Sequence, residues 1–404
     1  MNAVGIDVSK GKSMVAVLRP FGEIVASPFE VKHTVSELRK LADYLKSLNG
    51  ETRVVMESTG KYHQPIARFL HDAGLFVSVV NALLIYSYGG NSIRRVKTDK
   101  KDALKIASYG LDRWVDLAEY VPEEDVRQML KTYNRQYHQY SKLKVMLKNN
   151  LISLLDQTFP GVNTLFHSPP RKSDGHEKWI DFAAKFWHCE CVSALSPLSF
   201  KERYRKWCTK NGYYYNSVKA EDIYAESCGH IGTLPKDDCT KRLIAHAISL
   251  LNAVTETLAA VALEMSTLAS RLPEYPVVME MHGVGKILGP QLMAEIGDVR
   301  RFFHKQSLIA FAGIDAPPYQ SGAFEAHGRS ISKRGAPYLR KTLFLAMSCI
   351  LQTAHADDAV FQYLNKKRGE GKHYYVYMMA GANKFLRIYY ARIKQYLDGL
   401  ESVA

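Results

Sequence analysis

Cysteine is scarce in this chain, with six among 404 residues, and the spacing of the six is too irregular for a disulfide framework. No stretch has the roughly 20 consecutive apolar residues that a membrane helix needs. The first residues enter a strand-like run at once, which leaves no room for a signal peptide. Internal repeats and low-complexity tracts are also missing. These absences argue against a disulfide-stapled secreted domain and a membrane protein, so we expect a cytoplasmic location.

Acidic residues are in the minority, because 40 Asp and Glu stand against 54 Lys and Arg, for a formal net charge of +14. An excess of this size favours a polyanionic partner, with nucleic acid ahead of an acidic membrane surface. With 47% hydrophobic residues, the chain has the composition of a globular protein and the length for two or three domains. Charge alone does not decide the function.

Strand-like and helix-like segments alternate over the first 110 or so residues. Short apolar runs predict five strands, at 3–8, 14–18, 23–26, 53–56 and 75–80. Helical spacing predicts three helices, at 35–48, 64–73 and 99–109, the last capped by Thr98. The order β-β-β-α-β-α-β-α describes one α/β domain around a mixed sheet.

The remainder of the chain predicts mostly helices. Long amphipathic patterns at 122–155 and 240–268 suggest an antiparallel helical hairpin or coiled-coil arm. The insert between them, 157–237, has no fold that we can assign, and its cysteines and histidines lack the spacing of a zinc finger. We therefore expect domains at 1–118, 119–271 and 272–404.

Four carboxylates carry the clearest chemical pattern. Asp7 ends the first expected strand in Gly-Ile-Asp-Val-Ser, and Glu57 ends a later strand in Val-Val-Met-Glu-Ser-Thr-Gly. Asp99 and Asp102 are three residues apart on an expected helix, which places them on one face. Taken singly, each residue is better explained as a turn former, a cap or a helix N-terminal charge.

Taken together, the four carboxylates predict a metal site. Carboxylates converging from two strand ends and one helix repel one another unless cations lie between them. Hard oxygen ligands select Mg²⁺ or Mn²⁺. Two such ions stabilise the attacking and leaving oxygens of an in-line displacement at phosphorus, which is nuclease and transposase chemistry.

The motifs Gly-Ile-Asp-Val-Ser-Lys, Glu-Ser-Thr-Gly and Lys-Thr-Asp-Lys-Lys-Asp-Ala resemble the DEDD-type transposases of insertion sequences. That family includes Piv-type invertases and bridge-RNA-guided recombinases. The resemblance covers roughly residues 1–155 and 270–395 and leaves out the middle insert. It implies an α/β plus α architecture with a RuvC-like catalytic domain of the ribonuclease-H-like fold, followed by the helical arm and a mostly helical, serine-bearing C-terminal transposase domain.

A glycine-rich turn opens this C-terminal region. Gly283, Gly285 and Lys286 precede an expected helix at 287–296, as in a helix-hairpin-helix. The exposed N–H groups of such a turn can hold a phosphate. An ordinary turn between helices explains the same residues equally well.

Ser321 lies in an expected loop, in the context Tyr-Gln-Ser-Gly. Four cations that can hold a phosphate follow it, namely Arg329, Lys333, Arg334 and Arg340. By composition alone Ser321 is a turn serine, but the resemblance reverses that interpretation and implies a nucleophile that forms a phosphoserine bond with DNA. Ser330 and Ser332 are the alternative nucleophiles.

The resemblance also implies the partners. They are DNA, as the donor element junction and the target, and a non-coding guide RNA that pairs with both. Ser321 would act beside the carboxylate domain of a neighbouring subunit, so a dimer or tetramer is expected.

Aromatic and basic residues interleave at 363–367, 372–377 and 384–394. Such residues can contact phosphates and stack on unpaired bases. An amphipathic helix with its tyrosines in the core explains the same pattern, and both interpretations stay open.

Other functions leave part of the pattern unexplained. An actin-like ATPase needs further glycine-rich nucleotide loops that the chain lacks. A RuvC-like junction-resolving endonuclease using water needs the carboxylates but not Ser321. A non-catalytic nucleic-acid-binding protein has no use for clustered carboxylates, which weaken the binding of polyanions.

Overall fold

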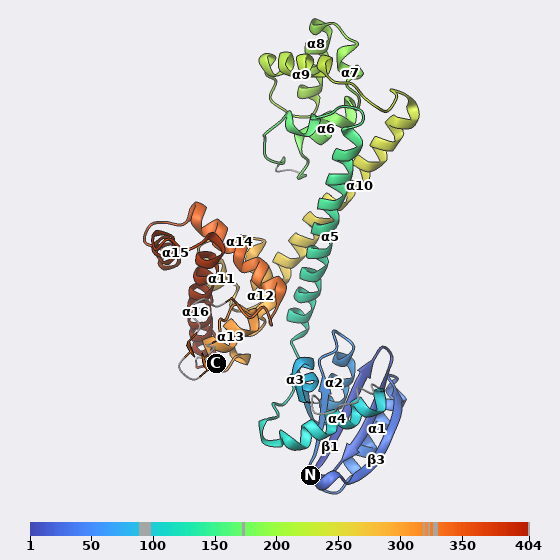
Figure 1. Ribbon diagram of the computed structural model, residues 1–404, viewed down its shortest axis with the longest axis vertical. Helices are drawn as coiled ribbons and strands as arrows, with labels where there is room; N and C mark the ends of the chain where they lie inside the picture. The colour runs from blue at the N-terminus through green and yellow to red at the C-terminus, as the bar shows by residue number, and fades with distance from the viewer. Residues whose placement is uncertain (89–97, 172–173, 318–319, 322–323, 326–329, 403–404) are drawn as a thin grey trace. The chain divides into compact units, whose positions relative to one another are not determined.

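The computed structural model describes residues 1–88, 98–171, 174–317, 320–321, 324–325 and 330–402 (Figure 1). The chain divides into two compact units, Met1–Glu123 and Glu124–Ala404. This division into two units does not test the three domain boundaries that we predict.

A five-stranded sheet forms the centre of the first unit. Its strands are β1 (Asn2–Ser9), β2 (Lys12–Leu18), β3 (Ile24–Lys32), β4 (Thr52–Glu57) and β5 (Phe76–Val80). They lie in the order β3-β2-β1-β4-β5. The first three are antiparallel neighbours, whereas β4 is parallel to β1 and β5 is parallel to β4. The expected mixed sheet is confirmed.

Helices cover both faces of this sheet. The helices of the first unit are α1 (Val35–Ser47), α2 (His63–Asp72), α3 (Ala82–Tyr88) and α4 (Asp99–Asp112). Apolar residues of α1 and α2 share one core with Val4 and Ile6 of β1. Helix α4 contacts β1 and β2, and its Ile106 packs with Val55 of β4.

Two details of the first unit differ from the sequence prediction. Strand β3 continues past residue 26 and pairs with β2 as far as Lys32. It passes through Pro28 because it lies at the edge of the sheet, where a missing N–H is tolerated. Helix α3 was not predicted, since an apolar run of seven residues has too few turns for its periodicity to be read.

Two long helices organise the second unit (Figure 1). They are α5 (Asp125–Leu155) and α10 (Asp238–Ala269). Leu151 near the end of α5 packs with Ile244 near the start of α10, and Leu130 packs in one core with Met265. The two helices are therefore antiparallel.

Helix α10 is, within the described ranges, the single helix long and apolar enough to cross a membrane by length and composition. It is amphipathic, because its buried positions recur every three or four residues, as at Ile244, Ile248 and Leu251. That buried stripe packs along α5 and the insert. The buried stripe is narrow, because 28% of the most apolar window of the helix is buried.

The insert forms a small helical subdomain with its own core. It contains α6 (Lys178–Lys185), α7 (Glu190–Ser193), α8 (Pro197–Lys210) and α9 (Ser217–Gly229). Its core is aromatic, with Phe159, Phe182, Phe200 and Tyr204 fully buried. Figure 1 shows these helices beyond the ends of α5 and α10 that meet the insert.

The C-terminal part consists of shorter helices around one apolar core. These helices are α11 (Tyr275–Met279), α12 (Leu288–Ile296), α13 (Lys305–Ala312), α14 (Pro337–Thr353), α15 (Ala359–Gly369) and α16 (Tyr374–Glu401). A two-residue pairing joins β6 (Gln320–Ser321) to β7 (Phe324–Glu325). Short 3₁₀ turns occur at Pro20–Gly22, Trp114–Asp116, Val162–Thr164 and Val299–Arg301.

Buried polar contacts attach α5 to the C-terminal part. Arg127 forms a bidentate ion pair with Glu274, and both side chains are buried. Seven and eight residues further along α5, Asn134 and Arg135 both donate to the buried carboxylate of Glu295, at 2.6 and 3.0 Å. These bonds satisfy two carboxylates that would otherwise be costly to bury.

Candidate active site and nucleic-acid interface

The four candidate carboxylates share one cavity in the first unit. Its volume is about 520 Å³, and we call it the acidic cavity. It is lined by Asp7, Glu57, Ala82, Leu83, Ile85, Tyr86, Asp99, Asp102, Lys105 and Ile106. The structure therefore brings together all four residues that the sequence singled out.

The position of Asp7 follows from the close packing of α4 on β1. Side chains alternate along a strand, so Gly5 and Asp7 face the same side of the sheet. A Cβ atom on Gly5 would overlap the backbone of Ala103 and Ala107, which shows that α4 lies directly against β1. Gly5 permits this approach, and the approach places the first turn of α4 beside Asp7.

Glu57 reaches the same side of the sheet through the parallel pairing of β1 and β4. Gly5 is the register partner of Val55, and the side chain of Val55 meets α4 at Gly110. Glu57 lies two residues after Val55, so it faces α4 as Val55 does. Parallel strands end at the same edge, which brings Glu57 near Asp7.

Asp99 and Asp102 occupy the first turn of α4. The Thr98 side chain caps this helix by accepting the backbone N–H of Lys101. Three-residue spacing points both carboxylates to one side, where the positive end of the helix dipole also favours them. The structure confirms the predicted helix start and cap.

One cation, Lys105, lines the acidic cavity together with the four carboxylates. It lies one turn after Asp102 on α4 and was missed at the sequence level. The spacing of three residues was its only signal. Nearby, the pKa of the exposed Lys12 ammonium is raised chiefly by its bond to Glu30, with a smaller contribution from the charge of Asp99.

The donor set of the acidic cavity suits a hard divalent cation, since it consists of carboxylate oxygens. In the part of the chain that the structure describes, however, no three His, Cys, Asp or Glu side chains lie close enough to hold one ion. The same finding applies to the thiols and histidines of the insert. Binding of an ion in the acidic cavity would require the four carboxylates to turn toward one another.

Ser321 lies in β6, where it pairs with Phe324 of β7 through the backbone. Arg329 lies outside the described residues. Ser330 is exposed and lines a cavity that is described below. Ser332 is engaged, because its hydroxyl donates to Asp315 at 2.5 Å and its backbone N–H donates to the carbonyl of Asp315.

The loop after Ser330 is fixed against the end of α13. Lys333 adopts a left-handed conformation, with φ of 54°, that is unfavourable for a residue with a side chain. Its backbone N–H donates to the carbonyl of Gly313. Arg340 donates to the carbonyls of Ala312 and Gly335, both at 3.0 Å. These bonds hold Lys333 and Arg340 in place, whereas Arg334 is exposed.

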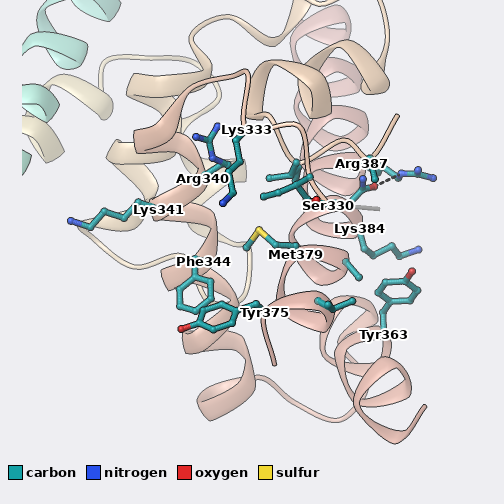
Figure 2. A pocket seen from close by; sticks show the side chains of 16 residues that line it. Ser330, Lys333, Arg340, Lys341, Phe344, Tyr363, Tyr375, Met379, Lys384 and Arg387 are labelled. Carbon is teal, nitrogen blue, oxygen red and sulfur yellow. Dashed lines mark hydrogen bonds between the residues drawn. The ribbon is translucent and has the colours of Figure 1, made fainter. Parts of the chain in front are cut away.

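A second cavity, of about 1000 Å³, lies in the C-terminal part, and we call it the basic cavity (Figure 2). Its lining includes five cations, which are Lys333, Arg340, Lys341, Lys384 and Arg387. No Asp or Glu occurs among its described lining residues. Three aromatic residues also line it, namely Phe344, Tyr363 and Tyr375.

The tyrosines of the C-terminal helices divide between core and cavity. Tyr377, Tyr389 and Tyr390 are buried in the apolar core, as the amphipathic-helix interpretation expects. Tyr363 and Tyr375 line the basic cavity instead. The amphipathic-helix interpretation is therefore confirmed for the three buried tyrosines, and the nucleic-acid interpretation stays a prediction for the two that line the cavity.

Phe344 and Lys341 were missed at the sequence level. Both lie on α14, Lys341 one residue and Phe344 four residues after Arg340, so helical spacing was an available signal for Phe344 but not for Lys341.

The two glycines of the glycine-rich turn differ in how closely they are packed. Gly283, with φ of 72°, lies so close to α14 that an added Cβ would overlap Ile350. Gly285 has open space around it, and Lys286 is exposed. The predicted helix at 287–296 corresponds to α12. The neighbouring His282 bonds to Asp358 at 2.9 Å, which ties the turn to the start of α15.

Comparison with known proteins identifies the chain. A family model described as a transposase, of the DEDD type found in IS110 elements, matches residues 4–160. A second model, described as transposase of the IS116/IS110/IS902 family, matches residues 275–362. The first region contains every residue that lines the acidic cavity. The second contains the residues of the basic cavity that come before α15 and α16, from Ile314 to Phe344.

Similar proteins extend the match through the insert. The insertion element IS110 uncharacterized 43.6 kDa protein of Streptomyces coelicolor is 23% identical over 97% of this chain and 93% of its own length. The pilin gene-inverting protein of Moraxella bovis is 22% identical over 85% of this chain and 80% of its own length. The chain belongs to the IS110 family of DEDD-type transposases, enzymes that recombine DNA.

Proposed function

We propose that the acidic cavity is the metal-dependent catalytic centre of this transposase and that Ser321 is its nucleophile. The single observation that carries the first part is the convergence of Asp7, Glu57, Asp99 and Asp102 on one cavity. The strand order β3-β2-β1-β4-β5, with β2 antiparallel to its neighbours, supports a RuvC-like domain of the ribonuclease-H-like fold.

The four carboxylates would hold Mg²⁺ or Mn²⁺, which supplies charge stabilisation for a displacement at phosphorus. Asp7 and Glu57 are fixed by the sheet, and Asp99 and Asp102 are fixed by the first turn of α4. A rigid framework of this kind restricts the carboxylates to small side-chain rotations.

Ser321 would attack a DNA phosphodiester. A bond forms between its hydroxyl oxygen and phosphorus, and the bond from phosphorus to a deoxyribose oxygen breaks, while the serine proton passes to that leaving oxygen. Attack by another strand's hydroxyl reverses the exchange, so no high-energy cofactor is consumed. Ser330 and Ser332 stay the alternative nucleophiles, and the hydroxyl of Ser332 donates to Asp315.

The proposal extends to partners. Lys286, Lys333, Arg334 and Arg340, with the turn at Gly283 and Gly285, would contact nucleic-acid phosphates. Arg329 belongs to the same set. A non-coding guide RNA would select the donor junction and the target by base pairing, and a dimer or tetramer would bring Ser321 of one subunit to the carboxylates of another, in the cytoplasm.

A covalent-adduct assay tests the mechanism. The protein is incubated with element-end RNA, junction and target DNA, and Mg²⁺, and denaturant-stable protein–DNA complexes are counted. We expect adducts from the wild type and none from Ser321→Ala or Asp102→Ala, with Ser330→Ala and Ser332→Ala as matched comparisons. Cleavage that survives Ser321→Ala but not Asp102→Ala would instead indicate a nuclease that uses water.

A further inference from the structure

The basic cavity combines two kinds of group that single-stranded nucleic acid requires. Cations bind backbone phosphates, and exposed aromatic rings stack on bases that are not paired. A duplex offers phosphates and base edges but no base faces for stacking, because its bases are stacked on one another. The presence of rings among the cations therefore favours single-stranded nucleic acid over a duplex.

The rings are arranged as a platform. Phe344 of α14 and Tyr375 of α16 are stacked, with centroids 5.8 Å apart and planes inclined by 26°. Tyr374 meets both rings edge-on, at 5.8 and 5.4 Å. Figure 2 shows the two stacked rings on one side of Met379 and Tyr363 on the other side. Tyr375 is 72% exposed, so its ring is open to a ligand.

Five cations line the same cavity as these rings. Lys333, Arg340 and Lys341 come from the loop before α14 and from its first turns, whereas Lys384 and Arg387 come from α16 (Figure 2). No ion pair between described side chains engages any of the five. Their charge is therefore available to a polyanion.

Hydrogen bonds orient two of the guanidinium groups before any ligand arrives. Arg340 donates to two backbone carbonyls, whereas the bond from Lys333 to Gly313 fixes only the backbone of Lys333 in its left-handed conformation. Arg387 donates to Asn383 at 2.9 Å, which orients its guanidinium on α16. Groups that are already ordered lose less conformational freedom when they bind.

The size of the cavity fits more than a single phosphate. Its volume of about 1000 Å³ is at the upper end of the range for ligand pockets, roughly 300–1,000 Å³. An isolated anion would leave most of that space and the whole aromatic platform unused. A nucleotide has a group suited to each part, since its phosphates match the cations and its base matches the rings.

We propose that the basic cavity binds an unpaired nucleotide of a nucleic-acid strand, with the base stacked on Phe344 and Tyr375 and the flanking phosphates held by Lys333, Arg340, Lys384 and Arg387. This proposal depends on the family's action on nucleic acid, but it does not depend on Ser321 or on the metal. During strand exchange, DNA bases leave their partners, and a guide RNA also contains unpaired bases. The shared ligand chemistry is an unpaired nucleotide from either source.

Binding of short labelled strands to the full-length protein tests the proposal. Fluorescence anisotropy in EDTA compares a single-stranded thymidine oligonucleotide with the same strand carrying abasic sites. Phe344→Leu and Tyr375→Leu remove the stacking surface and keep an apolar side chain. Tyr214→Leu, at an 85% exposed tyrosine of the insert, is the matched control. Thermal unfolding verifies that each variant is folded.

We expect the wild type and Tyr214→Leu to bind the intact strand more tightly than the abasic strand, by about 5- to 150-fold, the equivalent of 1–3 kcal/mol for a stacked base. Phe344→Leu and Tyr375→Leu should lose most of that difference. Lys384→Gln/Arg387→Gln should weaken intact and abasic strands alike, since it removes phosphate contacts and leaves the rings.

Equal affinity of the wild type for intact and abasic strands would overturn the proposal. So would an unchanged preference in the folded Phe344→Leu variant, or tighter binding of duplex DNA than of either single strand. Tighter binding of an RNA strand supports the proposal with the guide RNA as the source, and tighter binding of a DNA strand supports it with the recombining DNA. Because adduct formation is measured separately, failure here is distinguishable from failure of the serine mechanism.

Discussion

The acidic cavity takes its four carboxylates from two strand ends and one helix turn, whereas the basic cavity takes its five cations from one loop and two helices. The acidic cavity belongs to a unit built around a sheet, in which parallel strands fix the positions of successive side chains. The basic cavity is formed between helices, where position depends on packing. The negatively charged cavity is thus built on a sheet, and the positively charged cavity is built between helices.

The difference in charge indicates a difference in task. Four carboxylates repel a phosphate unless a metal lies between them, so the acidic cavity suits chemistry that depends on a bound cation. Cations and rings attract a strand directly, so the basic cavity suits binding. Substitutions that affect one cavity and not the other test this division.

Removal of one carboxylate should have the largest effect. Asp102→Asn keeps the shape of the side chain and removes its charge, and we expect strand cleavage to fall on the order of 10³-fold or more because a metal ligand is lost. Single-strand binding by the basic cavity should be unchanged. Asp43→Asn, at an exposed position of α1, is the control and should cleave normally. Normal cleavage by Asp102→Asn would remove Asp102 from the catalytic centre.

Disruption of the buried ion pair should destabilise the second unit. Arg127→Met leaves the buried Glu274 carboxylate uncompensated, which should lower the free energy of unfolding by about 3–5 kcal/mol. The double variant Arg127→Met/Glu274→Leu should recover most of that loss. Urea unfolding measures both. If the double variant is as unstable as the single one, the pair does not act through its buried charge.

Addition of a methyl group at Gly5 should displace α4, which carries two of the carboxylates of the acidic cavity. Gly5→Ala would push α4 away from β1 and should destabilise the first unit by roughly 1–3 kcal/mol, as overpacking does. Cleavage should fall with it, since Asp99 and Asp102 move with α4. Gly399→Ala, where nothing lies within reach of the added carbon, is the matched control. Thermal unfolding and the adduct assay give the two readouts.

Acidification should weaken the second unit through His138. Its buried ring stacks on Tyr338 at 4.7 Å, and neither ring nitrogen has a hydrogen-bond partner in the described structure. Burial, with help from Lys341 and Arg135, lowers the pKa of His138 to about 4. The unfolded state therefore takes up a proton first as the pH falls below about 6.5.

Because the unfolded state binds the proton at a higher pH than the folded state, acid lowers the stability of the folded state. The stabilising contribution of neutral His138 is complete above about pH 6.5 and is lost as the pH falls toward 4, by at most about 1.4 kcal/mol per pH unit. Urea unfolding across this range should show a shallower pH dependence for His138→Phe, which keeps the stacked ring and cannot titrate. Identical pH profiles for the wild type and His138→Phe would contradict the assignment.

The acidic cavity was largely predictable because each carboxylate lies in a short motif at the end of a regular element. Asp7 and Glu57 end strands whose alternation sets their face, and Thr98 marks the start of the helix that carries Asp99 and Asp102. The contact between Gly5 and α4 was not predictable, since the pattern does not say which helix approaches that strand.

The basic cavity was predictable only in part. Lys333 and Arg340 were expected near a phosphate, but the separation of Tyr375 from the buried Tyr377 required the packing of α16. Two residues apart on one helix, these tyrosines point in different directions, and only the neighbouring helices decide which direction is the core.

The sequence by itself determined the family, the mixed sheet, the long paired helices and the four carboxylates, because these depend on local motifs and on short-range periodicity. Only the tertiary structure decided the fold of the insert, the engagement of Ser332 by Asp315, and the meeting of Phe344 with Tyr375. The physical reason is that such contacts join residues far apart in the chain, whose proximity depends on how whole helices pack and not on the residues beside them.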